Sequence, residues 1–126
     1  MDQEFPQPDQ PHVVVLCLEG DLVRHEETGF EILIDELLDK KQRQFILEFS
    51  QVDFIDSAGI GLIIKTASMI EKRRGALFLC NPKANVKNVF LTLGIADRFR
   101  IFYSLGEALR TVGQLISVEF VPYKFK

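Results

Sequence analysis

Short hydrophobic runs alternate along the chain with longer segments in which apolar residues recur every three or four positions. The short runs occupy residues 13–18, 44–49, 76–80 and 99–103. Continuous apolar runs of this length are typical of strands buried on both faces, as in a sheet covered by helices. The longer segments, at 26–42, 58–74, 84–93 and 105–115, have the periodicity of amphipathic helices. The pattern predicts an α/β fold in which a strand followed by a helix occurs four times.

Strands that follow one another through a helix pair in parallel by right-handed crossovers. We therefore expect one α/β domain over residues 13–115, with a mixed, mostly parallel sheet of about four to five strands and about four helices packed on it. Residues 1–12 hold three prolines and few apolar groups, and we interpret them as an extended lead-in.

The last segment, residues 116–126, alternates apolar and polar residues but contains Pro122. Proline cannot donate to a strand ladder. We therefore expect this C-terminal tail to be a weak edge strand or mobile, and the domain to fold without it.

Composition narrows the functional classes. Hydrophobic residues make up 47% of the 126 residues and charged residues 26%, as in an ordinary globular domain. The net charge of −3 argues against a nucleic-acid surface. No apolar run approaches the roughly 20 residues of a membrane span, and no signal peptide is visible, so we expect a cytoplasmic protein with no membrane partner.

Cys17 and Cys80 lie in strand-like runs, where we interpret them as core thiols, and we expect no metal and no cofactor.

One of the predicted loops is chemically unusual. Loops after parallel strands gather at one edge of the sheet, and residues 50–57 form the central one. It ends in Asp56-Ser57, and the next four residues include Gly59 and Gly61. Ser57 is placed to be a helix N-cap, with its hydroxyl near backbone amides and the positive helix end, where a phosphoryl group is favoured. Position alone leaves open that Ser57 only caps a helix and that the glycines only allow close packing.

The residues around Ser57 resemble a known family signature. The phrase FILEFSQVDFIDSAGIGL, residues 45–62, resembles the central signature of the STAS domain of bacterial anti-sigma factor antagonists. Residues 20–22, Gly-Asp-Leu, are similar to the turn after that family's first long strand. Residues 86–99 are similar to its helix and turn that end in a final strand. The resemblance runs from residue 13 to about residue 112.

The resemblance implies a binding protein rather than an enzyme. An anti-sigma factor that is also a serine protein kinase would bind the unmodified chain, and phosphorylation of Ser57 would release it. A serine phosphatase is a further partner of such a cycle. The implied contact surface is formed by Asp21, Asp56, Ser57, Ala58, Gly59 and Ile60. Two departures are visible: prolines in the segment of the family's N-terminal strand, and a strongly charged stretch at residues 24–27.

Other functions remain as alternatives. Catalysis is disfavoured, because Ser57 lacks the G-x-S-x-G context and neither histidine follows in triad order, so no catalytic residue is assigned. A Mg²⁺-binding phosphoacceptor receiver could use Asp21, Asp53 and Asp56 with Lys83, but here the lysine follows Pro82 instead of preceding a proline. Within the STAS family, the alternatives are a scaffold of a signalling assembly, a component of a lipid-transport system, or a detached relative of the anion-transporter domain. The serine at position 57 favours the switchable antagonist.

Overall fold

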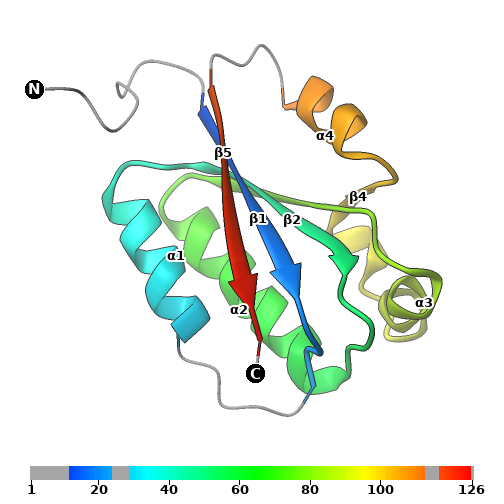
Figure 1. The fold of residues 1–126 in the computed structure, drawn as a ribbon. Coiled ribbons are helices and arrows are strands. Elements are labelled where there is room, and N and C mark those ends of the chain that lie inside the picture. The colour runs from blue at the N-terminus through cyan, green and yellow to red at the C-terminus, as the bar shows by residue number, and fades with distance from the viewer. Residues whose placement is uncertain (1–11, 24–28, 113–116, 126) are drawn as a thin grey trace, which may run out of the picture.

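The described residues form a five-stranded sheet in which every strand pairing is parallel. A computed structural model describes residues 12–23, 29–112 and 117–125. The strands are β1 (His12–Glu19), β2 (Gln44–Gln51), β3 (Ala76–Cys80), β4 (Arg100–Phe102) and β5 (Ser117–Lys124). Their spatial order is β4-β3-β2-β1-β5 (Figure 1). The α/β fold and the four expected strands are confirmed, but the expected mixture of directions is not found among these strands.

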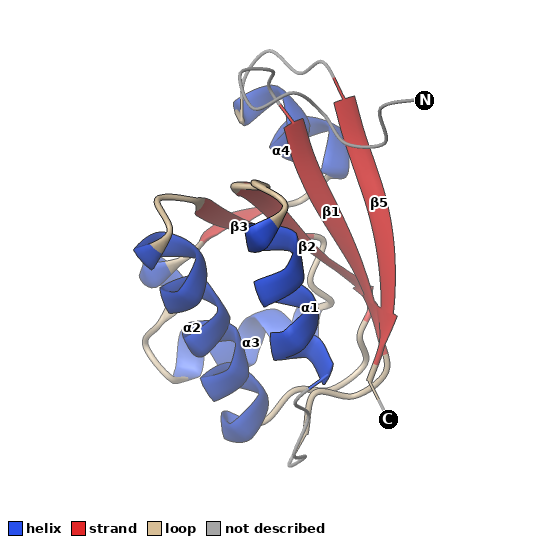
Figure 2. Cartoon of the chain, turned by 90° about the vertical axis from the view of Figure 1, so that its left-hand side faces the viewer, coloured by secondary structure: helices blue, strands red, loops and turns tan. Residues whose placement is uncertain are grey.

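Helices pack on both faces of the sheet. They are α1 (Gly29–Asp39), α2 (Ser57–Lys72), α3 (Ala84–Thr92) and α4 (Leu105–Thr111), with a short 3-10 turn at Ala96–Arg98. The side chains of α1, α2 and α3 join the larger core cluster on one face, where Figure 2 shows these three helices together. The other face carries a smaller cluster with Ala108, Leu105 and Leu109 of α4. The two clusters explain why the strands between them are apolar on both sides.

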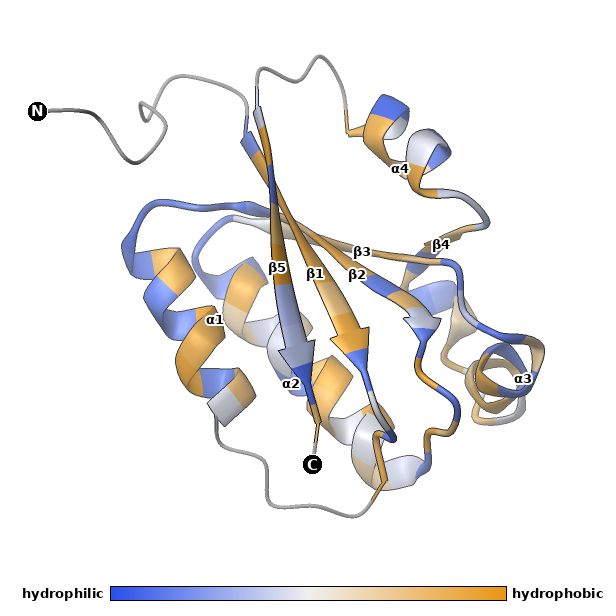
Figure 3. Ribbon diagram, in the orientation of Figure 1, coloured by the Kyte–Doolittle hydropathy of each residue, from blue (hydrophilic) through white to orange (hydrophobic). Residues whose placement is uncertain are grey.

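Strand β1 is the most deeply buried part of the sheet. Residues Val13 to Leu16 are fully buried, and Figure 3 shows the strand as hydrophobic over most of its length. Alternate side chains enter opposite clusters, with Val14 and Leu16 in the larger one and Val13 and Val15 in the smaller one. The strand therefore lies inside the sheet, between β2 and β5.

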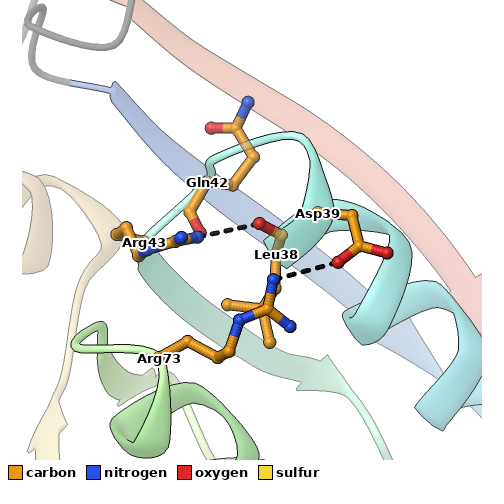
Figure 4. A network of polar contacts seen from close by, with 5 residues as sticks. All are labelled: Leu38, Asp39, Gln42, Arg43 and Arg73. Atoms are coloured by element: carbon orange, nitrogen blue, oxygen red, sulfur yellow. Dashed lines mark hydrogen bonds and ion pairs between the residues drawn. The ribbon is translucent and has the colours of Figure 1, made fainter.

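Polar contacts join the ends of α1 and α2 far from the carboxyl edge of the sheet. Arg43 Nη1 donates 2.8 Å hydrogen bonds to the carbonyl oxygens of Leu38 and Gln42, and Arg73 Nη2 lies 2.9 Å from Asp39 Oδ1 (Figure 4). The Leu38 carbonyl at the end of α1 also accepts from Lys41 N at 3.0 Å, so Arg43 adds a second donor there. The exposed Arg73–Asp39 pair orients the two helix ends but adds little free energy.

The element boundaries agree with the periodicity to within a few residues, with several expectations outside the described part. The N-terminal lead-in, the charged stretch at 24–27 and the first residues of the helix expected from 26 lie outside it, as does the end of the helix expected to reach 115. Within the described residues, no helix is long and apolar enough to cross a membrane.

The C-terminal segment differs most from expectation. Strand β5 pairs with β1 over eight residues, and the register continues through Pro122, which lies opposite Cys17. A proline at a sheet edge leaves the ladder intact when its nitrogen faces away from the neighbouring strand. Beyond the strand, Phe125 is only 3% exposed and belongs to the larger core cluster. The tail therefore forms an edge strand, one of the two expected outcomes, but Pro122 does not interrupt its pairing with β1.

Candidate functional site

The loops after β1 and β2 meet at the carboxyl edge of the sheet, next to the start of α2. Leu22 N donates to Phe54 O at 2.9 Å, and Asp56 N donates to Leu22 O at 3.1 Å. The two loops also form a parallel bridge between Leu22 and Ile55. Leu22 is fully buried, so this pairing is anchored in the core. Backbone hydrogen bonds to the loop after β1 therefore help to hold the Asp56-Ser57 turn in place.

Asp56, not Ser57, is the N-cap of α2. Its Oδ1 accepts hydrogen bonds from Ala58 N at 2.9 Å and Gly59 N at 3.1 Å. Its carbonyl oxygen accepts the first helical bond, from Ile60 N at 2.9 Å. Ser57 is the first helical residue, and its side chain is exposed. The sequence prediction was wrong by one residue, because aspartate and serine are about equally good caps and stand side by side here.

This cap changes the electrostatics at Ser57. Two of the amides that a phosphoryl group could have used already bind the Asp56 carboxylate. A phosphoryl group on Ser57 would therefore add its charge beside an existing carboxylate. The positive helix end still favours negative charge, but it is shared between two anionic groups.

The six expected contact residues differ in exposure. Ser57 and Ala58 are exposed, and Asp21 and Asp56 are half-buried, at the edge where the loops meet. Gly59 and Ile60 are buried. A Cβ at Gly59 would lie 2.1 Å from Leu22 O, so this glycine permits the close approach of the helix to the loop. Gly59 and Ile60 therefore lie beneath this surface and are not exposed on it.

A shallow groove of about 290 Å³ lies beside Ser57, between the start of α2 and helix α3. It is lined by Ile55, Asp56, Ser57, Asn88, Val89, Thr92 and Leu93. Ser57 stands on one side, and Asn88 and Thr92 stand on the other. Phe54, on the neighbouring loop, is 59% exposed. The groove residues on α3 could not be recognised from the sequence, because that helix has an ordinary composition. Only the fold brings them close to Ser57.

The acidic residues of the loops do not gather. Lys83 Nζ pairs with the Asp53 carboxylate, and Asn85 Nδ2 donates to Asp53 O, which ties the β2–α2 loop to the start of α3. Across the described part of the chain, no three His, Cys, Asp or Glu side chains lie close enough to hold a metal ion. The carboxylates described here therefore do not form the ligand set that the receiver alternative requires.

Comparison with known proteins places the chain in a family. A family model described as the STAS domain matches residues 5–108. The chain belongs to the STAS domain family. Among relatives of this STAS chain, BtrV of Bordetella bronchiseptica, provisionally named an anti-sigma factor antagonist, is 27% identical over 71% of this chain and 77% of its own. The anti-sigma F factor antagonist of Paenibacillus polymyxa is 26% identical over 66% of this chain and 72% of its own.

Solved structures share the fold of this STAS domain. The unphosphorylated anti-sigma factor antagonist SpoIIAA has a TM-score of 0.62 at 24% identity, covering 82% of this chain and 90% of its own. Its phosphorylated form, from Bacillus, has a TM-score of 0.59 at 24% identity over 77% and 88%. A sulfate transporter family protein from Wolinella succinogenes has a TM-score of 0.65 at 20% identity over 86% and 88%. At these identities the likeness establishes the fold and not a partner.

Proposed function

We propose that this STAS domain is an anti-sigma factor antagonist controlled by phosphorylation of Ser57. Unmodified, it binds an anti-sigma factor of the serine-kinase type, and phosphorylation at Ser57 by that partner releases it. The chain itself acts by binding and has no catalytic role in this scheme. The observation that carries the proposal is the exposed Ser57 hydroxyl at the first residue of α2, beside an apolar groove.

The surface around Ser57 suits a protein partner. Ser57 and Ala58 are small and exposed, and the adjoining groove has apolar walls from Ile55, Val89 and Leu93. An apolar side chain of the anti-sigma factor in this groove would bring its backbone close to the Ser57 hydroxyl. Buried apolar anchors surrounded by small, near-neutral contacts are the usual arrangement of an energetic hot spot.

The switch follows from charge and solvation. Phosphate adds about −1.5 to −2 charges at neutral pH. In the free domain that charge stays in water, so the fold tolerates it. In the complex it would be desolvated beside the Asp56 carboxylate, which is fixed in place by Ala58 N and Gly59 N. A cost of about 3 kcal/mol weakens binding roughly a hundredfold, because each 1.4 kcal/mol is a factor of ten.

Partner affinity of four forms tests the proposal. Wild type and Ser57→Ala should bind the anti-sigma factor equally, while Ser57→Asp and the Ser57-phosphorylated chain should bind at least about tenfold more weakly. Calorimetric or fluorescence titration measures the affinities, and thermal melts check folding.

A matched control separates local repulsion from added charge alone. Ser104 is the N-cap of α4 and accepts a hydrogen bond from Glu107 N at 3.1 Å. Ser104→Asp keeps a good cap and adds the same charge on a helix that packs against the other face of the sheet. It should bind as wild type does. Equal affinities for all these forms would contradict the switch and favour a scaffold role.

A further inference from the structure

Strand β5 lies outside the part of the chain that the family model matches, yet it reaches the functional edge. The match covers residues 5–108, and β5 begins at Ser117. Because β5 runs parallel to β1, both strands end at the same edge of the sheet, where Figure 1 shows the end of β5 beside the end of β1. The residue that follows the strand, Phe125, therefore lies near the loop that holds the Asp56-Ser57 turn.

Phe125 is fixed by both its ring and its backbone. Its ring centroid is 5.4 Å from that of Phe30 and 5.0 Å from that of Tyr123. Its backbone N donates to Glu19 O at 2.8 Å. Only 3% of the residue is exposed. Phe125 is thus part of the hydrophobic core.

The backbone of Phe125 lies directly against Gly20. A Cβ at Gly20 would be 2.7 Å from Phe125 O, and Gly20 has a φ of +102°, which favours glycine. Gly20 N in turn donates to Gln51 O at 3.3 Å. Gly20 is therefore enclosed between Phe125 and the end of β2.

Two residues further on, Leu22 holds the turn that bears Ser57. Its amide and carbonyl bracket the turn through bonds to Phe54 O at 2.9 Å and Asp56 N at 3.1 Å. Gly59 packs against the same Leu22 carbonyl. A continuous path of short backbone contacts thus runs from Phe125 through Gly20 and Leu22 to Asp56.

We propose that β5, through Phe125, positions the Asp56-Ser57 turn, and that Phe125 and Gly20 are positioning residues for partner binding. The consequence for binding rests on the proposed function, whereas the positioning itself does not. The loop from Gly20 to Leu22 has one neighbour on the β2 side and Phe125 on the other. Without its buried ring, the backbone of Phe125 is anchored less firmly against Gly20. The bonds of the loop to Phe54 and Asp56 then open more often, while the centre of the sheet keeps its pairing.

Amide hydrogen exchange of the whole chain, followed by NMR, tests the positioning without any partner. In Phe125→Ala, protection of the Leu22 and Asp56 amides should fall at least about tenfold more than that of Leu47 and Leu79 in the central strands. Phe125→Leu, which keeps an apolar side chain, should restore most of that difference. Phe120→Ala, on the same strand but 56% exposed, is the control and should leave all four amides unchanged.

Gly20→Ala addresses the same contact from the opposite side, in case Phe125→Ala does not fold. It should produce the same selective loss at Leu22 and Asp56. Unchanged exchange at those two amides in the variants, or an equal loss throughout the sheet, would overturn the proposal. Affinity for the anti-sigma factor should fall with the loss of protection. If wild type itself does not bind that partner, the proposed function fails while the exchange result still decides the positioning.

Discussion

Two glycines on α2, separated by one residue, have opposite surroundings. A Cβ at Gly59 would meet Leu22 O at 2.1 Å, whereas nothing lies within 4 Å of a Cβ at Gly61. The sequence suggested one packing role for both. Gly61 has no such packing role. In the free domain it therefore lowers the stability of the helix, as a glycine does relative to an alanine, with no close contact to compensate.

The glycine pair gives a matched prediction. Gly59→Ala should destabilise the domain by about 2 kcal/mol or more, because backbone atoms would have to move. Gly61→Ala should stabilise it by about 0.5–1 kcal/mol through helix propensity. Urea unfolding of both variants measures the two changes. A stable Gly59→Ala protein would contradict the close contact with Leu22.

The two cysteine thiols lie on either side of Glu48 across three neighbouring strands, and burial raises the pKa of both. Cys17 lies opposite Glu48 on β2, and Glu48 lies opposite Cys80 on β3. Burial, and then the nearby Glu48 carboxylate and Cys17, raise the pKa of Cys80 to about 12 from its ordinary value of 9.0. Burial and Glu48 also raise the pKa of Cys17.

Cys80 should therefore be almost inert in the folded domain. At pH 8 a thiol-reactive disulfide reagent should modify half-buried Cys17 first and Cys80 only at the rate of unfolding. From about pH 9 the unfolded chain loses the Cys80 proton while the folded chain keeps it up to about pH 12, so stability falls as pH rises through this window. Cys80→Ala should flatten that fall in urea unfolding measured from pH 8 to 11. An equally steep fall in the variant would contradict the assignment to Cys80.

Among the elements, α2 depends on its cap for both its start and its functional geometry. Asp56→Ala should cost about 1 kcal/mol of unfolding free energy, since it leaves Ala58 N and Gly59 N without their acceptor. Asp56→Asn keeps an acceptor and should be close to wild type in stability. The asparagine variant should also weaken the effect of Ser57 phosphorylation on partner affinity, because the neighbouring negative charge is gone. Unfolding and affinity measurements on both variants check these two effects separately.

Most elements could be predicted because each carries its own local pattern. The apolar run of β3, residues 76–80, matches the structure residue for residue. The cap of α2 could not be placed to the residue, because Asp56 and Ser57 have similar propensities. Neither could the groove be predicted, because only the tertiary fold brings Val89 and Leu93 of the α3 side to the same groove as Ser57.

At the scale of the whole molecule, the sheet edge next to β1 is filled by the end of the chain. The tail was expected to be weak because it has only three alternating apolar residues and a proline. Its pairing with β1 could not be anticipated, since an edge strand takes much of its stability from the neighbour it meets rather than from its own composition. Phe30, Tyr123 and Phe125 pack their rings together across α1 and the end of β5. That cluster depends on residues about ninety positions apart and has no local signal.

Deleting residues 117–126 should therefore destabilise the whole domain, contrary to what the sequence alone suggests. The deletion removes a strand paired over eight residues and the buried Phe125, and it exposes β1, which is otherwise fully buried from Val13 to Leu16. Loss of one large core side chain alone costs about 3–5 kcal/mol, a large share of a typical domain's stability. A bare, apolar strand edge also favours association of chains.

Urea unfolding with size-exclusion chromatography should show a lower midpoint or aggregation, and a synthetic peptide of residues 117–126 should restore part of the stability by adding the strand back. A truncated domain as stable and monomeric as the full chain would show that β5 is not part of the folding unit.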